Sequence, residues 1–345
     1  MTKLAAPWPG AVAVSGGGDS LALMHLLCDW SKAQGREAPV VLTVDHGLQK
    51  DSAAKAKQVV AWAKRAGLKA HVLAWEGKKP KSDVEAESRE ARYRLMGAWC
   101  RKRGLAALYV GHTRDDQAET FLLRLARGSG LDGLAAMRPV SAYPVQGFRD
   151  LLVVRPLLEI ERDALRTHLT ARGQEWFEDP MNSDPRFSRV RIRAALDHLR
   201  AAGLAPGRIA DAAAHLSRAR EALDAVTAAV MRRACRSEGE AVLVDSTALL
   251  AAPREVGLRA IATMLMAVSG QAYRPRFERL ERLYDSIAGD RLGGARTLHG
   301  CRIGPASGSD AYFGTGTLRI SREPGRRTPE KGRKSGRIAG GETGS

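Results

Sequence analysis

The chain has 345 residues, of which 44% are hydrophobic and 27% charged, a composition that excludes a wholly disordered or fibrous protein. Its apolar runs are far shorter than the ~18 residues that a membrane-spanning helix needs, and the first residues lack the apolar stretch of a signal peptide. The four cysteines lie far apart with no C-x-x-C pair, which favours neither a disulfide framework nor a zinc ribbon. We therefore expect a cytoplasmic protein of two or three domains.

The chain is strongly basic, with 55 Lys and Arg against 38 Asp and Glu and a net charge of +17. The segment from Arg322 to Ser345 carries seven basic and three acidic residues, so most of the excess charge lies outside it. Because no basic amphipathic helix stands out, the charge favours nucleic acid over a membrane surface as a partner. The alternative is incidental basicity of an arginine-rich sequence.

The first half alternates patterns typical of strands and helices. Short apolar runs predict strands at 11–14, 40–44, 70–75, 106–110 and 153–154. Helical spacing of apolar residues follows the first four runs, with the helices starting near residues 21, 52, 84 and 115. This alternation predicts an α/β fold with a doubly wound, mostly parallel sheet. Ligands of such sheets bind beyond the carboxyl ends of the strands, where the polar stretches 15–20, 45–47 and 111–116 lie.

From about residue 159 the pattern becomes mainly helical. It predicts an Ala-rich helix over 207–235, a strand at 241–245, helices near 255–268 and 276–287, and short strands within 295–303 and 312–320. We expect a first domain over 1–195, an α-rich region with a small α+β module over 196–321, and a basic tail over 322–345. The tail has almost no apolar residue, so we expect it to be disordered.

A glycine-rich loop, Ser15-Gly16-Gly17-Gly18-Asp19-Ser20, joins the first strand to the first helix. Glycines let backbone N–H groups turn towards an anion, and the helix N-terminus adds a partial positive charge. The hydroxyls of Ser15 and Ser20 can bind phosphate oxygens, and the carboxylate of Asp19 can hold the Mg²⁺ that accompanies a polyphosphate. A glycine-rich turn without a ligand is the alternative. No lysine follows the glycines at the spacing of a Walker A loop, which excludes that motif.

Three acids begin the helix that follows the fourth strand. Asp115 and Glu119 stand four residues apart, and Asp116 and Glu119 stand three apart, so these carboxylates project near one another on one helical turn. They are suited to binding a cation. The alternative is a solvated first turn that the helix dipole favours.

These stretches together resemble a known family. The S-G-G-x-D-S pattern is similar to the loop of the N-type ATP pyrophosphatases, or PP-loop enzymes, which cleave ATP between its α and β phosphates and adenylate a substrate. Within them, the resemblance selects the tRNA(Ile)-lysidine synthetases through V-D-H-G-L at 44–48, E-A-R-Y-R at 90–94, G-H-T-R-D-D-Q-A-E-T at 111–120 and R-P-L at 155–157. It covers about residues 10–195, with weaker matches at 274–277 and 298–301.

The resemblance implies a ligase that forms a C–N bond. Such enzymes use ATP and Mg²⁺ to adenylate the wobble cytidine of tRNA(Ile) with a CAU anticodon, and free L-lysine then displaces AMP to give lysidine, which changes codon recognition from AUG to AUA. Residues 1–195 would be the catalytic PP-loop domain and 196–321 the tRNA-binding region. A homodimer is one candidate assembly. The alternatives are another tRNA-modifying PP-loop enzyme such as a thiolase, which the lack of C-x-x-C disfavours, and a non-catalytic nucleotide- or RNA-binding protein.

The resemblance also assigns roles to residues. The expected catalytic residues are Asp19, Arg92, His112, Asp116 and Glu119. The loop from Ser15 to Ser20 is expected to bind ATP, with Asp19 as the candidate Mg²⁺ ligand. Candidates for binding lysine or tRNA are Asp115, Asp116, Glu119, Arg189, Arg191 and Arg193. Two positions depart from the family pattern: Thr113 stands where His or Asn is frequent, and Val190 replaces the Asn of R-N-x-I-R.

Overall fold

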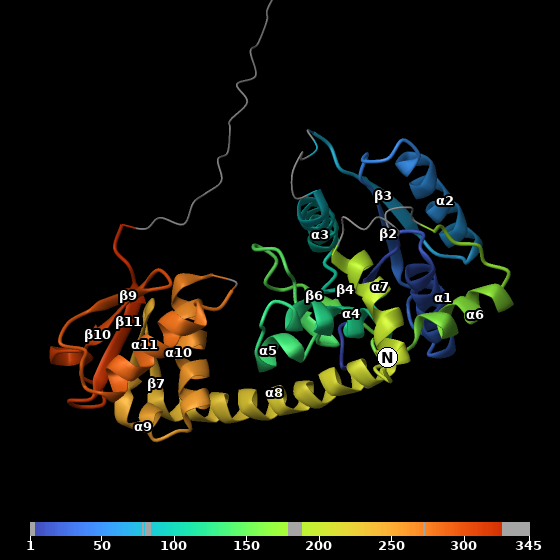
Figure 1. The fold of residues 1–345 in the computed structure, drawn as a ribbon. Helices are drawn as coiled ribbons and strands as arrows, with labels where there is room; N and C mark the ends of the chain where they lie inside the picture. The colour runs from blue at the N-terminus through green and yellow to red at the C-terminus, as the bar shows by residue number, and fades with distance from the viewer. Residues whose placement is uncertain (1–3, 78, 80–83, 179–187, 272, 326–345) are drawn as a thin grey trace, which may run out of the picture. The chain divides into compact units, whose positions relative to one another are not determined.

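The structure is a computed structural model that describes residues 4–77, 79, 84–178, 188–271 and 273–325. Contacts within the chain divide it into two units, residues 1–220 and 221–345, each with its own sheet (Figure 1). The predicted disordered tail, from residue 326 onwards, lies outside the described residues.

The first unit is built on a six-stranded sheet with the strand order β3-β2-β1-β4-β6-β5. All neighbouring strands are parallel except β5 and β6, which are antiparallel. The strands are β1 (Ala11–Ala13), β2 (Val40–Asp45), β3 (Ala70–Ala74), β4 (Ala107–Tyr109), β5 (Val140–Ala142) and β6 (Leu152–Val154). The predicted doubly wound, mostly parallel sheet is confirmed.

Helices cover both faces of this sheet. Successive residues of β1 point to opposite faces, and Val12 joins a core formed with α1, α2 and α6, whereas Ala11 joins a core formed with α3. The helices of the unit are α1 (Gly18–Ala33), α2 (Ser52–Arg65), α3 (Val84–Lys102), α4 (Arg114–Leu125), α5 (Leu131–Leu134), α6 (Arg162–Ala171), α7 (Ser188–Ala201) and the first part of α8 (Pro206–Ala234).

The sequence did not indicate β5. This strand has three residues, Val-Ser-Ala, which are half-buried or exposed, and prolines stand on either side of it at 139 and 144. It therefore lacks the apolar run that predicts a strand. Its place at the edge of the sheet tolerates such a sequence.

The strand order places two of the predicted motifs side by side. The chain passes from β1 to β2 and β3 on one side, then crosses to β4 and β6 on the other, so β1 and β4 flank the switch point where such sheets bind ligands. A Cβ atom on Gly111, just after β4, would lie 2.9 Å from the carbonyl oxygen of Asp19 and 3.0 Å from the Cα of Ser20. Glycine at 111 therefore lets the two loops touch through their backbones.

The second unit is a small α+β module. Its antiparallel sheet has the strand order β7-β8-β11-β10-β9, and its core contains residues of α10, α11 and the sheet. Its elements after α8 are β7 (Cys235–Glu238), β8 (Ala241–Asp245), α9 (Ser246–Leu250), α10 (Arg254–Ser269), α11 (Phe277–Ala288), β9 (Arg296–Leu298), β10 (Cys301–Pro305) and β11 (Thr317–Arg322). The predicted α+β module is confirmed. No helix among the described residues is long and apolar enough to span a membrane.

The boundary between the units differs from the domain boundary expected at residue 195. The chain divides at Arg220, within α8. Residues of α7 remain with the first unit because Leu196 packs with Ala118 of α4 and Ile209 of α8 in a small apolar cluster.

Candidate active site

The glycine-rich loop follows β1 and runs directly into α1. Gly16 has a φ of +90°, and a Cβ atom there would lie 2.5 Å from the ring of Phe177, so only glycine fits. The amide of Phe177 donates to the carbonyl oxygen of Gly16 at 2.9 Å. Gly17 is the N-cap of α1, which begins at Gly18. The first turn of a helix has N–H groups without intrahelical partners, and this is an arrangement that binds phosphate.

Two hydroxyls and one carboxylate project from this turn. The Oγ of Ser20 donates to the carbonyl oxygen of Gly17 at 2.8 Å and accepts from the amide of Ser15 at 3.2 Å. The Oγ atoms of Ser15 and Ser20 are 3.3 Å apart. Asp19 is largely buried, and burial raises the pKa of its carboxyl group although the guanidinium of Arg162 acts in the opposite direction. The polar groups of the loop are thus held by contacts within the loop itself.

Thr113 fixes the start of α4 and the side chain of Asp116. The amide and Oγ1 of Thr113 donate to Oδ2 of Asp116 at 2.8 and 2.9 Å, and the amide of Asp116 donates to Oγ1 of Thr113 at 3.4 Å. This reciprocal arrangement is a capping box. Thr113, which departs from the expected family pattern, therefore has a local structural role that orients a predicted catalytic acid.

Arg162, the first residue of α6, lies between the carboxylates of Asp19, Asp116 and Glu119, which we call the acid cluster. Its Nε is 3.1 Å from Oδ2 of Asp19, its Nη2 is 3.3 Å from Oδ1 of Asp116, and its Nη1 is 3.6 Å from Oε1 of Glu119. Its backbone amide donates to Oδ2 of Asp115 at 2.8 Å. The motifs in the sequence did not identify Arg162. The available signal was its place at a helix start beyond the carboxyl end of β6, where ligands of such sheets bind.

Arg193 of α7 binds Glu119 from a second side. Its Nε donates to Oε1 at 2.6 Å and its Nη2 to Oε2 at 3.3 Å, while the side chain of Glu119 is only 2% exposed. Arg189 stands four residues before Arg193 on the same helix, and its charge lowers the pKa of His112. Arg191 lies between them and is exposed. Helical spacing therefore brings two of the three predicted arginines towards the site, whereas Arg191 stands at an exposed position.

His112 has a buried and unsatisfied nitrogen. Its Nδ1 has no hydrogen-bond partner among the described residues. The pKa of His112 is lowered to about 4: burial is the largest cause, Arg155, Arg89 and Arg189 act in the same direction, and Asp116 opposes them. The imidazole is therefore neutral at pH 7, with one ring nitrogen available to a ligand.

The ion-paired groups leave one negative charge in excess. Burial alone would raise the pKa of Asp116, but Arg162, His112 and the donors of Thr113 together hold it below its ordinary value. The acid cluster thus presents three carboxylates to the two guanidiniums of Arg162 and Arg193. Because the cluster is largely buried, water screens the charges of these ion-paired groups weakly.

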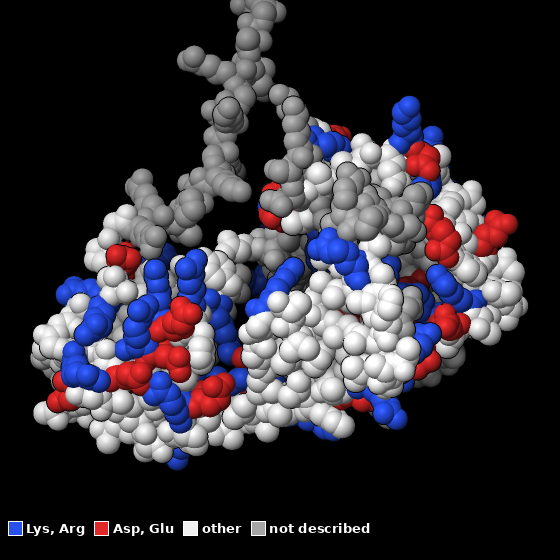
Figure 2. All heavy atoms as spheres, in the orientation of Figure 1, with Lys and Arg blue, Asp and Glu red and all other residues white. Residues whose placement is uncertain are grey.

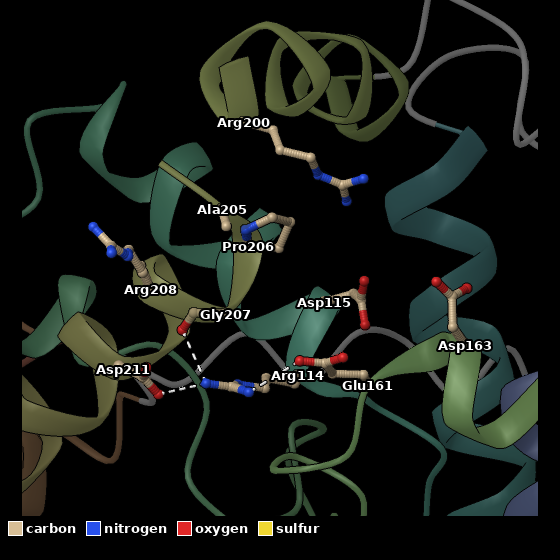
Figure 3. Close-up of a pocket in the computed structure, with 10 residues that line it drawn as sticks. All are labelled: Arg114, Asp115, Glu161, Asp163, Arg200, Ala205, Pro206, Gly207, Arg208 and Asp211. Atoms are coloured by element: carbon tan, nitrogen blue, oxygen red, sulfur yellow. Dashed lines mark hydrogen bonds and ion pairs between the residues drawn. The ribbon is translucent and has the colours of Figure 1, made fainter. Parts of the chain in front are cut away.

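A cavity of about 390 Å³ opens beside Asp115. Arg114 at its floor is already paired, with its Nη1 3.1 Å from Glu161 and its Nη2 2.7 Å from Asp211. Figure 3 shows the carboxylates of Asp115 and Asp163 and the guanidinium of Arg200 around the open space. The cavity therefore presents charges of both signs next to the acids that begin α4. Its lining residues are Arg114, Asp115, Glu161, Asp163, Arg200, Ala205, Pro206, Gly207, Arg208 and Asp211.

Comparison with known proteins determines the family. Residues 9–199 match the PP-loop domain family. A tRNA(Ile)-lysidine synthase of Methylobacterium nodulans is 39% identical over 336 residues, which cover 92% of this chain and 93% of the relative. One from Ruegeria pomeroyi is also 39% identical, over 85% of this chain and 68% of the relative. The chain belongs to the tRNA(Ile)-lysidine synthase family.

Membership of the lysidine synthase family confirms the function predicted from the motifs. The chain is an ATP-dependent ligase that forms a C–N bond and acts on tRNA. The thiolase alternative has less support from the curated relatives. Among solved structures, a U34-tRNA thiolase from Methanococcus maripaludis aligns with 62% of this chain and 70% of its own, with 18% identity and a TM-score of 0.48.

Other motif residues of this chain have structural contacts. The side chain of Gln117 exchanges two hydrogen bonds with the backbone of Met137, at 3.0 and 2.9 Å. The guanidinium of Arg155 donates to the carbonyl oxygen of Arg138 and to Ser141, which joins β6 to β5. Arg92 lies half-buried on α3. The ion pairs described for the acid cluster are made by Arg162 and Arg193, so a catalytic role for Arg92 stays a prediction.

Proposed function

We propose that the loop from Ser15 to Ser20 binds the phosphates of ATP and that Asp19 contributes to holding Mg²⁺. Mg²⁺ is usually bound by one or two carboxylates together with substrate phosphates, instead of by an all-protein cage. The described residues contain no cluster of three His, Cys, Asp or Glu side chains able to hold a metal ion. A single carboxylate at the start of α1 fits the first arrangement. When bound, the ion would neutralise charge on the polyphosphate.

In the first step the C2 oxygen of the wobble cytidine attacks the α phosphorus of ATP, and the bond to the leaving pyrophosphate breaks. The protein's contribution is to bind and orient the phosphates and the base. The amides at the start of α1, the hydroxyls of Ser15 and Ser20, and the positive charge of Arg189 support this role. Arg92 and the exposed Arg191 are further candidates for contact with ATP or the tRNA backbone.

In the second step the side-chain amine of lysine attacks C2, the bond from C2 to the adenylate oxygen breaks, and AMP leaves. The amine must lose a proton before it attacks. We assign Asp116 and Glu119 to binding this cationic group, and the neutral His112 to accepting a hydrogen bond or proton from it. The excess negative charge of the acid cluster beside the ATP-binding loop is the observation that carries this assignment.

The cavity beside Asp115 supports entry of lysine from that side. A free amino acid carries charges of both signs, and the lining offers the carboxylates of Asp115 and Asp163 together with the guanidinium of Arg200. Such a lining matches a zwitterion better than a purely anionic or apolar ligand.

The region over residues 196–321 is proposed to bind the tRNA. Figure 2 shows Lys and Arg side chains on the visible face of each unit, with acidic residues among them. In the second unit Tyr273, Phe277 and Tyr312 are 69%, 59% and 56% exposed, and the guanidinium of Arg236 lies 4.1 Å from the ring centre of Tyr312. Exposed aromatic rings next to arginines bind unpaired bases by stacking.

A cytoplasmic location is part of the proposal, and a homodimer is one candidate assembly. The four cysteines are free, which is typical of a reducing compartment. Light scattering of the purified protein at several concentrations would measure the mass of the particle and would decide between monomer and dimer.

The experiment for the function measures AMP release from ATP with a tRNA(Ile) transcript that carries a CAU anticodon, with and without lysine. We expect release that requires the tRNA, together with incorporation of labelled lysine. Release that needs tRNA but ignores lysine would reject lysine as the nucleophile. Absence of release under every condition would reject catalysis. A tRNA(Met) transcript, which has the same unmodified anticodon, serves as the control for substrate selection.

A further inference from the structure

We propose that Arg162 is a positioning residue that couples the ATP-binding loop to the acids that receive lysine. This inference rests on the proposed roles of Asp19, Asp116 and Glu119. In this proposal Arg162 contacts neither ATP nor lysine. It determines the positions and the ionisation of the carboxylates that bind them.

The contacts of Arg162 join three elements. Its guanidinium pairs with Asp19 of α1 and with Asp116 and Glu119 of α4, while its own backbone belongs to α6. The backbone amide of Arg162 is held by Asp115 at 2.8 Å, so the origin of the side chain is fixed relative to α4. One planar group thus links the carboxylate of the ATP-binding loop to both carboxylates of the proposed lysine site.

The three acids depend on Arg162 to different degrees. Asp116 is also held by Thr113, and Glu119 is also held by two bonds from Arg193. The described ion pair of Asp19 is the one with Arg162. Loss of the guanidinium should therefore affect Asp19 most strongly, because the other two acids keep a second anchor.

This arrangement predicts linked behaviour of the two half-sites. The guanidinium of Arg162 has enough N–H donors for all three carboxylates. A cation that binds Asp19, or the pair Asp116 and Glu119, therefore changes the hydrogen bonds that Arg162 makes with the remaining carboxylates. Removing Arg162 should therefore alter adenylation and lysine use in the same variant. A lysine at 162 carries the same charge, but its compact ammonium cannot span the carboxylates of two helices as the planar fork does.

The test compares Arg162→Met and Arg162→Lys with Arg166→Met, a matched control one turn later on α6. Arg166 pairs with the exposed Glu178, a contact worth little. Three quantities are measured on the full chain: tRNA-dependent ATP–pyrophosphate exchange without lysine, the KM for lysine in the complete reaction, and the Tm. For Arg162→Met we expect exchange to fall at least about tenfold and the lysine KM to change at least about fivefold, since small misplacements of reacting groups cost about that much or more.

The split between kcat and KM separates positioning from a general loss of structure. Asp116 and Glu119 keep second anchors in Thr113 and Arg193, so a folded Arg162→Met chain still carries both acids, but in altered positions. Its KM for lysine should therefore change, and Arg162→Lys, which keeps the charge but not the planar fork, should change it in the same direction. A variant that was merely destabilised would lower kcat in proportion to the loss of folded protein and leave the KM for lysine unchanged.

The proposal is overturned if Arg162→Met leaves either exchange or the lysine KM within about twofold of wild type, the range expected for an exposed ion pair. It is also overturned if the loss of rate only follows the loss of folded protein. Failure of the proposed function would appear differently, as wild-type protein that incorporates no lysine.

Discussion

Glu119 and Arg193 form an ion pair with two hydrogen bonds, of 2.6 and 3.3 Å, that joins α4 to α7. The carboxylate is almost fully buried, and the guanidinium is about one third exposed. The apolar cluster of Ala118, Leu196 and Ile209 lies at the same junction. The helix that carries the predicted tRNA-binding arginines is thus attached to the acids of the site.

The first prediction concerns this pair. Glu119→Gln removes one charge from the acid cluster and should slow lysine transfer about 100-fold, while lysine-independent ATP–pyrophosphate exchange persists, because Asp19 and the loop keep their contacts. A double-mutant cycle with Arg193→Met should give a coupling of about 1–3 kcal/mol in the free energy of unfolding. If the two substitutions lower the free energy of unfolding by strictly additive amounts, the ion pair of Glu119 and Arg193 does not stabilise the fold.

The second prediction concerns Asp19. Asp19→Asn should abolish tRNA-dependent exchange, because the amide cannot hold Mg²⁺ as a carboxylate does. Asp29→Asn is the matched control on the same helix, where the exposed Asp29 pairs with Arg172. Measuring exchange and Tm for both variants tests the role. Wild-type exchange by Asp19→Asn would remove Asp19 from the site.

The third prediction concerns the contact between the loop and the acid block. Gly111→Ala places a Cβ atom 2.9 Å from the carbonyl oxygen of Asp19 and should cost about 1–3 kcal/mol, as overpacking does. It should also raise the KM for ATP. Gly130→Ala is the control, since no atom lies within 4 Å of a Cβ there. Thermal unfolding and ATP titration check both effects, and equal behaviour of the two variants would refute the steric argument.

The fourth prediction is a pH dependence of stability. The pKa of His112 is lowered to about 4 in the folded chain, whereas it is about 6.5 in an unfolded one. Below pH 6.5 the unfolded chain binds a proton that the folded chain excludes, so stability is complete above that pH and falls towards pH 4 by up to about 1.4 kcal/mol per pH unit. His112→Asn should flatten this part of the profile.

The control for that profile is His215→Asn, at an exposed position on α8. Its Tm should follow the wild-type dependence between pH 7 and 4. If the profile of His112→Asn is as steep as that of wild type, His112 is not buried in its neutral form.

Most of the fold could be predicted from the sequence because periodicity and loop chemistry agree there. The apolar run before Ser15 predicts β1, and the glycines and Asp19 after it predict a strand-to-helix turn at the sheet's carboxyl edge. Strand β5 could not be predicted, since an edge strand of Val-Ser-Ala has no distinctive pattern. The end of the first unit within α8 could not be predicted either, because a continuous helix shows no change of composition at Arg220.

The acids of the site could be predicted from local spacing, but their partners could not. Asp116 and Glu119 lie one turn apart on α4, and both meet the same guanidinium. That guanidinium belongs to Arg162, an ordinary arginine at the start of another helix, and only the packing of α6 against α1 brings it there. Arg189 and Arg193 share a helical face that the alternation of three arginines did not reveal.

The contact between Phe177 and Gly16 has a consequence for synthesis of the chain. The glycine-rich loop leaves the ribosome long before the ring that packs on Gly16 and the guanidiniums of Arg162 and Arg193. Contacts so distant along the chain form slowly. A nascent chain that ends before α6 carries the loop and the acids without the cations that hold them, so nucleotide binding should begin only when the first unit is almost complete.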